Sequence, residues 1–223
     1  METLLTFLEL MGNLIRGVLR LDPAVYEAAL ETSIAGFLSL FILFLAGMSD
    51  TIGNSVVLFA NRVPRRRFLL AIFVEALTFV VGVLLWAGSI WLMAGLIFDA
   101  WQPYYYVVRV VALGYAPLLF GFLILLPYLG NIIFVILRIW MLLAVLVGVS
   151  VDYGFGLLPA LVCTVLGWFL LTLLTRLPFL RLERIDDFLW RFSTGRSLEL
   201  DAQEAVALYI EEVRSQASNE GGS

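Results

Sequence analysis

The sequence predicts an all-α fold: a polytopic integral membrane helix bundle of about five transmembrane helices, flanked by amphipathic interfacial helices. The first observation is composition, because 62% of the 223 residues are hydrophobic and the mean hydropathy is +0.99, far above the range of soluble domains. The second is a set of long, nearly uncharged apolar runs. Since lipid offers the backbone no hydrogen-bonding partner, such runs must cross as helices, which satisfy their own peptide groups.

Five apolar runs are candidate crossings: residues 34–48, 68–98, 107–126, 132–151 and 157–174. A run of about 18 or more apolar residues can cross a hydrocarbon core about 30 Å thick. The run 34–48 is short, and the polar residues that follow it leave two interpretations of residues 32–60 open. Either one helix crosses at residues 32–55, or a span breaks at residues 47–50 and a short interfacial helix follows. We expect one crossing, because a polar backbone break at membrane depth is tolerated only inside protein or beside water.

Residues 1–22 predict an amphipathic helix that precedes the transmembrane domain. Its polar residues form one narrow stripe at helical spacing: Glu2, Glu9, Asn13, Arg16 and Arg20. Such a helix lies either in the membrane interface or against the protein's own bundle. The start lacks the basic segment and small-residue cleavage site of a secretory signal, so we expect the helix to be retained. Asp22-Pro23 should end it, with Asp22 as the N-cap of the next helix.

Arginine clusters predict the orientation of the chain. One cluster lies in residues 61–67, and another follows the last apolar run, whereas the other loops carry Asp99 and Asp152. By the positive-inside rule, residues 61–67 and the C-terminus should face the cytoplasm. We therefore expect a transmembrane domain at 23–176 and a cytoplasmic amphipathic appendage at 177–223 with a disordered tail. All 14 basic residues are arginine, a bias typical of GC-rich bacterial genomes, so we expect a bacterial cell membrane.

Charged residues at membrane depth need partners, because each costs about 2.5–3.5 kcal/mol to insert. Glu75 and Arg138 lie at similar depth from the cytoplasmic ends of their runs, and this predicts a Glu75–Arg138 ion pair. Arg109 lies at the outer level with Asp99 and Asp152, so we expect it to pair with one of them, preferably Asp152. These charges favour a structural clamp, and an ion or proton path is the alternative.

Small residues recur on two of the predicted helices. Gly88 and Gly95 lie seven residues apart, as do Gly114 and Gly121. Such spacing places small residues on one helix face and allows close helix packing. The contact is either within this chain or with a second copy or partner.

The composition excludes several kinds of chemistry. Without histidine or lysine, the chain lacks the usual general base, the usual haem ligand and any Schiff-base amine. Cys163 lies within an apolar run, where we expect a buried structural thiol. No catalytic motif is present, so we expect no enzyme activity, no cofactor and no metal site. The net charge of −4 makes a nucleic-acid partner unexpected.

Residues 66–175 resemble the Yip1-type membrane domain. The resemblance rests on the segment Tyr115-Ala116-Pro117, the tight turn at 127–131, the intramembrane Trp140 and a glycine-rich loop at 154–160. It implies five membrane helices and no catalytic residue. This chain departs from the eukaryotic members, because it carries its appendage at the C-terminus rather than the N-terminus. Their trafficking-GTPase partner is therefore not transferred.

These observations favour a non-enzymatic organiser or accessory subunit. Its expected partners are membrane lipids and either another membrane protein or a second copy of the chain. The alternative is a small transporter or channel built around Glu75 and Arg138.

Overall fold

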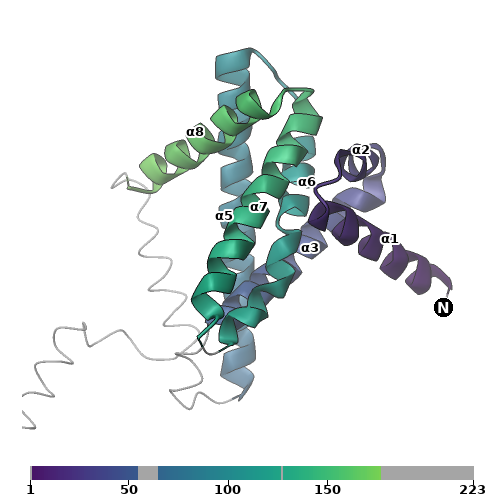
Figure 1. Ribbon diagram of the computed structural model, residues 1–223, viewed down its shortest axis with the longest axis vertical. Helices are drawn as coiled ribbons and strands as arrows, with labels where there is room; N and C mark the ends of the chain where they lie inside the picture. Colours follow the sequence, from purple (N-terminus) through teal and green to yellow (C-terminus); the bar gives the residue numbers. More distant parts are fainter. Residues whose placement is uncertain (1, 55–64, 127, 177–223) are drawn as a thin grey trace, which may run out of the picture. The chain divides into compact units, whose positions relative to one another are not determined.

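The computed structural model describes residues 2–54, 65–126 and 128–176, which all lie within one compact unit, Met1–Leu180. Every element in this part of the chain is a helix, as Figure 1 shows, so the predicted all-α class is confirmed. The elements are α1 Glu2–Leu19, α2 Pro23–Glu31, α3 Ser33–Asn54, α5 Arg65–Phe98, α6 Tyr104–Gly114, the 3-10 helix η1 Ala116–Leu125, α7 Gly130–Tyr153 and α8 Leu157–Arg176. The appendage predicted at 177–223 and residues 61–64 of the basic loop lie outside the described residues.

Four stretches of helix are long and apolar enough to cross a membrane: Ile34–Gly53, Ile72–Phe98, Tyr104–Leu125 and Gly130–Tyr153. They correspond to the first four predicted runs, and the chain is a helical membrane protein. The apolar stretch of α8, Leu157–Leu173, is shorter. A fifth crossing therefore stays a prediction.

Helix α3 is continuous from Ser33 to Asn54, which confirms a single helix where two interpretations were open. The polar residues at 47–54 do not break it, because contacts with η1 and α5 bury them: Gly53 meets Gly121 of η1, and Gly47 meets Phe79 of α5. Gly47, Ser49, Asp50 and Gly53 are all buried. The polar residues that suggested a helix break in the sequence instead form a packing surface.

The third crossing, predicted as one apolar run, is divided into two helical segments of different geometry. Helix α6 ends at Gly114, and η1 continues with 3-10 geometry for 10 residues, an unusual length. Pro117 lies at the start of η1 and has no N–H to donate to the preceding turn. Ser49 on α3 adds a second cause, because its hydroxyl donates to the Leu119 carbonyl (2.8 Å) and accepts from the Phe122 N–H (3.0 Å). A side chain from α3 thus supplies hydrogen bonds within the η1 backbone.

The N-terminal helices pack on this bundle. Asp22 caps α2 as predicted, accepting a hydrogen bond from the Ala24 N–H at 3.1 Å. The C-terminal half of α1 buries Leu14 and Val18, whereas Asn13 and Arg16 stay exposed. This packing favours the interpretation that α1 rests on the protein's own helices.

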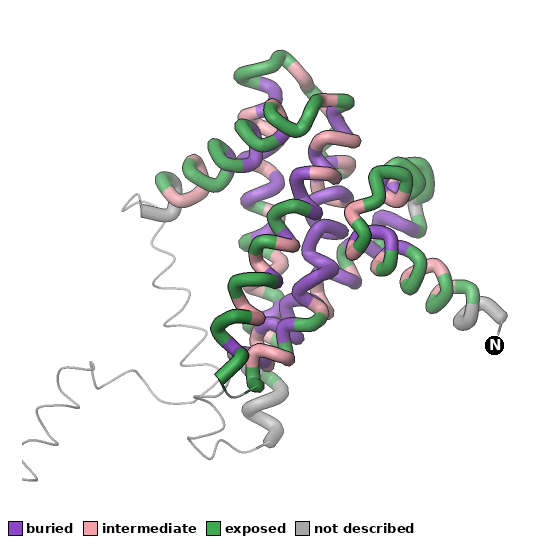
Figure 2. The backbone as a smooth tube through the Cα atoms, in the orientation of Figure 1, coloured by how far each residue is buried: buried purple, intermediate pink, exposed green. Residues whose placement is uncertain are grey.

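Close helix contacts are made through glycine, and buried residues concentrate on α3, α6 and the inner face of α7 (Figure 2). A Cβ on Gly121 would lie 2.8 Å from the Asp50 Cα, and one on Gly114 would lie 2.9 Å from the Val145 Cα. On α8, a Cβ on Gly167 would lie 2.9 Å from the Ile90 nitrogen of α5. These contacts fix α3 against η1, α6 against α7, and α8 against α5.

Candidate ligand-binding groove

A cavity of about 680 Å³ lies between α5, α7 and α8. We call it the lateral groove, and its lining residues are Phe79, Gly82, Val83, Trp86, Tyr115, Arg138, Met141, Leu142, Thr164, Val165, Trp168 and Leu171. Almost all of this lining is apolar. The charged side chain among the lining residues is Arg138.

Helix packing explains why the lateral groove exists. Helix α5 packs on α3, α6 and α8, whereas α7 packs on α2, α6, η1 and α8. Helices α5 and α7 therefore do not pack on each other, and α8 contacts both. Gly82 contributes no side chain to the gap, and a Cβ there would meet nothing within 4 Å. The groove is thus a consequence of helix directions and of a glycine in its wall.

Arg138, which lines the groove, forms an ion pair with Asp50. The Arg138 guanidinium donates to an Asp50 carboxylate oxygen at 2.8 Å, linking α7 to α3. The Arg138 side chain is 34% exposed and that of Asp50 only 10%. Because Asp50 is not among the lining residues, the groove meets the cationic member of the pair. Arg138 also stacks over Phe134, with 5.1 Å from the guanidinium carbon to the ring centroid.

Aromatic side chains form the deeper wall. Tyr115 is buried, and its ring contacts those of Phe79 and Trp86 at centroid distances of 5.4 and 6.1 Å. Within the described part of the chain, two buried donors of this region have no acceptor: the Trp86 Nε1 and the Arg138 Nε. Among the residues that line the groove, the buried polar atoms without a partner are therefore hydrogen-bond donors.

The partner predicted for Arg138 was wrong. Arg138 pairs with Asp50, not with Glu75. The physical reason is rotation about the helix axis: Ile72 and Ala76 mark the buried face of α5 here, and Glu75 lies on the exposed face. Depth along a helix was predictable, but the side of α5 that faces α7 was not. Asp50 was missed because residues 47–54 were considered a possible break, although an acid inside a continuous α3 is the signal for such a pair.

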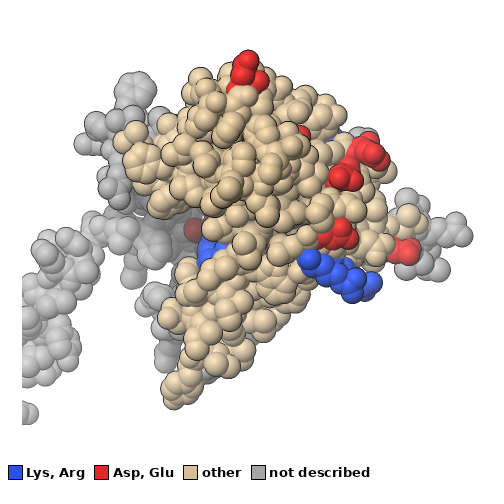
Figure 3. All heavy atoms as spheres, turned by 45° about the horizontal axis from the view of Figure 1, so that its top comes forward, with Lys and Arg blue, Asp and Glu red and all other residues tan. Residues whose placement is uncertain are grey.

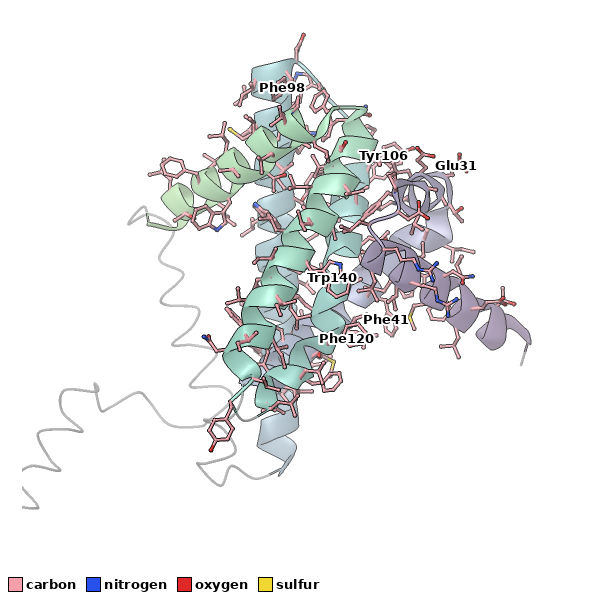
Figure 4. All side chains as sticks on the ribbon, in the orientation of Figure 1. Glu31, Phe41, Phe98, Tyr106, Phe120 and Trp140 are labelled. Atoms are coloured by element: carbon pink, nitrogen blue, oxygen red, sulfur yellow. The ribbon has the colours of Figure 1, made fainter. Side chains whose placement is uncertain are left out.

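The partner predicted for Arg109 was also wrong. Its guanidinium donates to the Leu30 carbonyl at 3.1 Å and stacks on Tyr105 and Tyr106 of its own helix. Leu30 lies in the last turn of α2, where backbone carbonyls lack helical partners and a positive charge is favourable. The position of Tyr106 on α6 and of Glu31 at the end of α2 can be followed in Figure 4. Arg109 thus caps a helix.

The two acids proposed for Arg109 have different surroundings. Asp99 is exposed just after α5, and Asp152 is buried near the end of α7. The Asp152 Oδ2 has no hydrogen-bond partner among the described residues.

Few charged side chains are visible on the face shown in Figure 3, as expected for a surface that meets lipid.

The glycines singled out in the sequence fall into two groups. Gly114 and Gly121 both lie at close helix contacts but do not share one helix face, because Gly114 of α6 meets α7 and Gly121 of η1 meets α3. Gly95 instead accommodates the Trp101 indole, where an added Cβ would lie 2.6 Å from ring atoms, and Gly88 lies near the Tyr104 ring. Gly88 and Gly95 thus pack against aromatic side chains at the start of α6 and in the segment just before it.

The motif residues lie at the division of the third crossing and on α7. Tyr115 joins α6 to η1, Ala116 and Pro117 begin η1, and all three are buried. Trp140 is half-buried on α7, where Figure 4 labels it.

The geometry defines a class: a helical membrane protein with a laterally placed apolar groove and an arginine in its wall. Within the described residues, no group of three acidic or cysteine side chains lies close enough to hold a metal ion. Comparison with protein-family models, curated proteins and solved structures found no match to this chain.

Proposed function

We propose that this chain is a non-enzymatic membrane protein, an organiser or accessory subunit that holds a component of the bilayer in the lateral groove. The observation that carries the proposal is the groove itself: a cavity of about 680 Å³ with apolar walls and an arginine at its edge. Largely apolar cavities with a few polar groups are typical of ligand sites. The proposal also includes a relationship to Yip1-type domains and a location in a bacterial cell membrane. In that membrane, the arginine clusters face the cytoplasm.

The test is extraction into native lipid nanodiscs, followed by mass spectrometry of all lipids and proteins that copurify. Gly82→Leu places a side chain in the groove, and its Cβ would meet no atom within 4 Å. Gly12→Leu is the matched control, because Gly12 on α1 is equally open and lies away from the groove. We expect a component that is stoichiometric with the wild type and Gly12→Leu, and depleted from Gly82→Leu. Equal retention by all three proteins would refute the proposal.

A small transporter or channel is the second candidate, and one observation favours it. The third crossing is divided at Tyr115, beside the Asp50–Arg138 pair, and discontinuous helices often mark ion sites in transporters. The acid in this candidate is Asp50 rather than Glu75. Proton or ion flux into proteoliposomes should then fall with Asp50→Asn and persist with Glu75→Gln. Flux that is absent from the wild type would eliminate this candidate.

A further inference from the structure

We propose that the occupant of the lateral groove is an anionic phospholipid, with its phosphate beside Arg138 and an acyl chain along the apolar wall. This inference rests on the proposed function, because it names the ligand class of the same groove. Its starting point is the asymmetry of the ion pair. The cationic partner lines the groove and is 34% exposed, whereas the anionic partner lies behind it at 10%.

Arg138 retains donors for a second acceptor. A guanidinium has five N–H donors in a planar fork that suits phosphate geometry. Asp50 accepts from one terminal nitrogen of Arg138. The partly exposed guanidinium can therefore hold the carboxylate and a phosphate oxygen together.

The level of Arg138 in the membrane fits a lipid headgroup. Its guanidinium lies over Phe134, four residues after the first residue of α7, so it is directed towards that end of the helix. At 1.5 Å per residue, Phe134 is about 6 Å from the start of α7. Asp50 lies at a similar distance, about 6 Å, from the end of α3. The pair is thus about one helical turn inside the ends of the apolar spans Ile34–Gly53 and Gly130–Tyr153, a depth that a lipid phosphate can reach.

The rest of the groove suits an acyl chain. Its walls beyond Arg138 include Phe79 on α5, Leu142 on α7 and Val165 on α8. The hydroxyl of Thr164 is already used, because it donates to the Ala160 carbonyl at 2.7 Å. A hydrocarbon chain would therefore meet apolar atoms along most of its length. A phospholipid requires a polar contact for its headgroup and an apolar channel for its acyl chain, and the groove offers both.

The experiment measures lipid retention in nanodiscs that contain equal amounts of phosphatidylglycerol and phosphatidylcholine with identical acyl chains. The protein is released and its bound lipid is identified by native mass spectrometry. We expect the wild type to retain phosphatidylglycerol over phosphatidylcholine by at most about fivefold. A basic residue near the surface contributes about 1 kcal/mol of attraction to an anionic lipid, and the Asp50 carboxylate offsets part of it.

Two variants separate the headgroup from the groove. Asp50→Asn combined with Arg138→Gln removes both charges together, leaves neither unpaired, and should bring the preference to about equal retention. Gly82→Leu should lower the retention of both lipids, whereas Gly12→Leu should retain the wild-type preference. Inorganic phosphate added to the wild type should not displace the lipid, because it lacks the acyl chain.

Each of the other outcomes would overturn a specific part of the proposal. Equal retention of both lipids by the wild type overturns the anionic headgroup and leaves groove binding intact. Displacement by inorganic phosphate overturns the lipid as the ligand. A stoichiometric protein segment in place of a lipid also overturns it, while the proposed function stands. A wild type with no retained component in these discs or in native nanodiscs refutes both.

Discussion

Asp50 and Arg138 form an ion pair whose two members have different surroundings. Asp50 is almost enclosed between α3 and η1, and Arg138 borders the lateral groove. Removing one member of a buried pair leaves an unpaired charge, which costs about 3–5 kcal/mol. Removing both costs much less, because no charge is then left without a partner. The pair therefore links α3 to α7 and also presents a cation to the groove.

Asp50→Asn should lower the thermal stability of the protein more than the double variant Asp50→Asn/Arg138→Gln does. The expected loss for the single variant is about 3 kcal/mol, because Arg138 loses its carboxylate. Cys163 is the only cysteine and is buried, so labelling by a thiol-reactive dye reports unfolding during heating. Glu27→Gln, at an exposed position on α2, serves as the control. Melting of the double variant below the single variant would contradict the account.

Tyr26 gives a pH dependence. It is fully buried, its hydroxyl donates to the Ala144 carbonyl at 2.8 Å, and burial raises the pKa of the hydroxyl above its ordinary value. The folded state therefore keeps this proton at a pH where the unfolded state loses it. The contribution is complete below the ordinary tyrosine pKa of about 10, and stability falls as pH rises beyond it, by at most about 1.4 kcal/mol per pH unit. Tyr26→Phe should reduce the slope of stability against pH above that value and leave the slope near neutrality unchanged. An unchanged slope in the variant would show that Tyr26 is not the source.

At the scale of elements, the contact between α3 and η1 organises the third crossing. Ser49 bonds to the η1 backbone, and Gly53 and Gly121 let the two helices approach closely. The sequence predicted an apolar run here, together with glycine at 114 and 121. It did not predict 3-10 geometry, because the Ser49 hydrogen bonds join residues about seventy positions apart. Local pattern thus determines that a segment is helical, whereas tertiary contact selects the type of helix.

Gly121→Ala should destabilise the protein, because the new Cβ would lie 2.8 Å from the Asp50 Cα and 2.9 Å from its nitrogen. Backbone atoms cannot move aside as a flexible side chain can. We expect a loss of about 1–3 kcal/mol, typical of overpacking. Gly12→Ala is the matched control, since alanine at an open helical position is neutral or stabilising by up to about 1 kcal/mol. Both are measured by thiol labelling on heating, and equal melting of the two variants would refute the close contact.

At the scale of the whole molecule, hydropathy predicted the class and most helices, because lipid permits few alternatives to a helix. The lateral groove could not be predicted, since it depends on which helices pack on one another: α8 contacts both α5 and α7, which do not pack on each other. The two predicted ion pairs, both of which were wrong, show the same limit. Depth along a helix follows from residue counting, but Glu75 and Asp50 can be ranked as partners for Arg138 only when helix rotation is known.

The orientation of the chain can be tested with single cysteines in a Cys163→Ala background. Arginines at 61–67 predict that the start of α5 faces the cytoplasm. Gln102, which follows the crossing of α5, should then lie outside, and Tyr128, which follows η1, should lie inside. A membrane-impermeant maleimide should label Gln102→Cys in intact cells and Tyr128→Cys only after permeabilisation. The reverse pattern would show that the orientation is wrong.

The most direct test of the central claim is a cryo-electron microscopy structure of the protein in native lipid nanodiscs, enlarged by a bound antibody fragment. We predict elongated density between α5, α7 and α8, with its compact end beside Arg138 and its narrow end along Leu142 and Val165. The Asp50–Arg138 pair should remain formed beside it. A groove closed by direct contact of α5 with α7, or one empty of density while the surrounding side chains are resolved, would contradict the account.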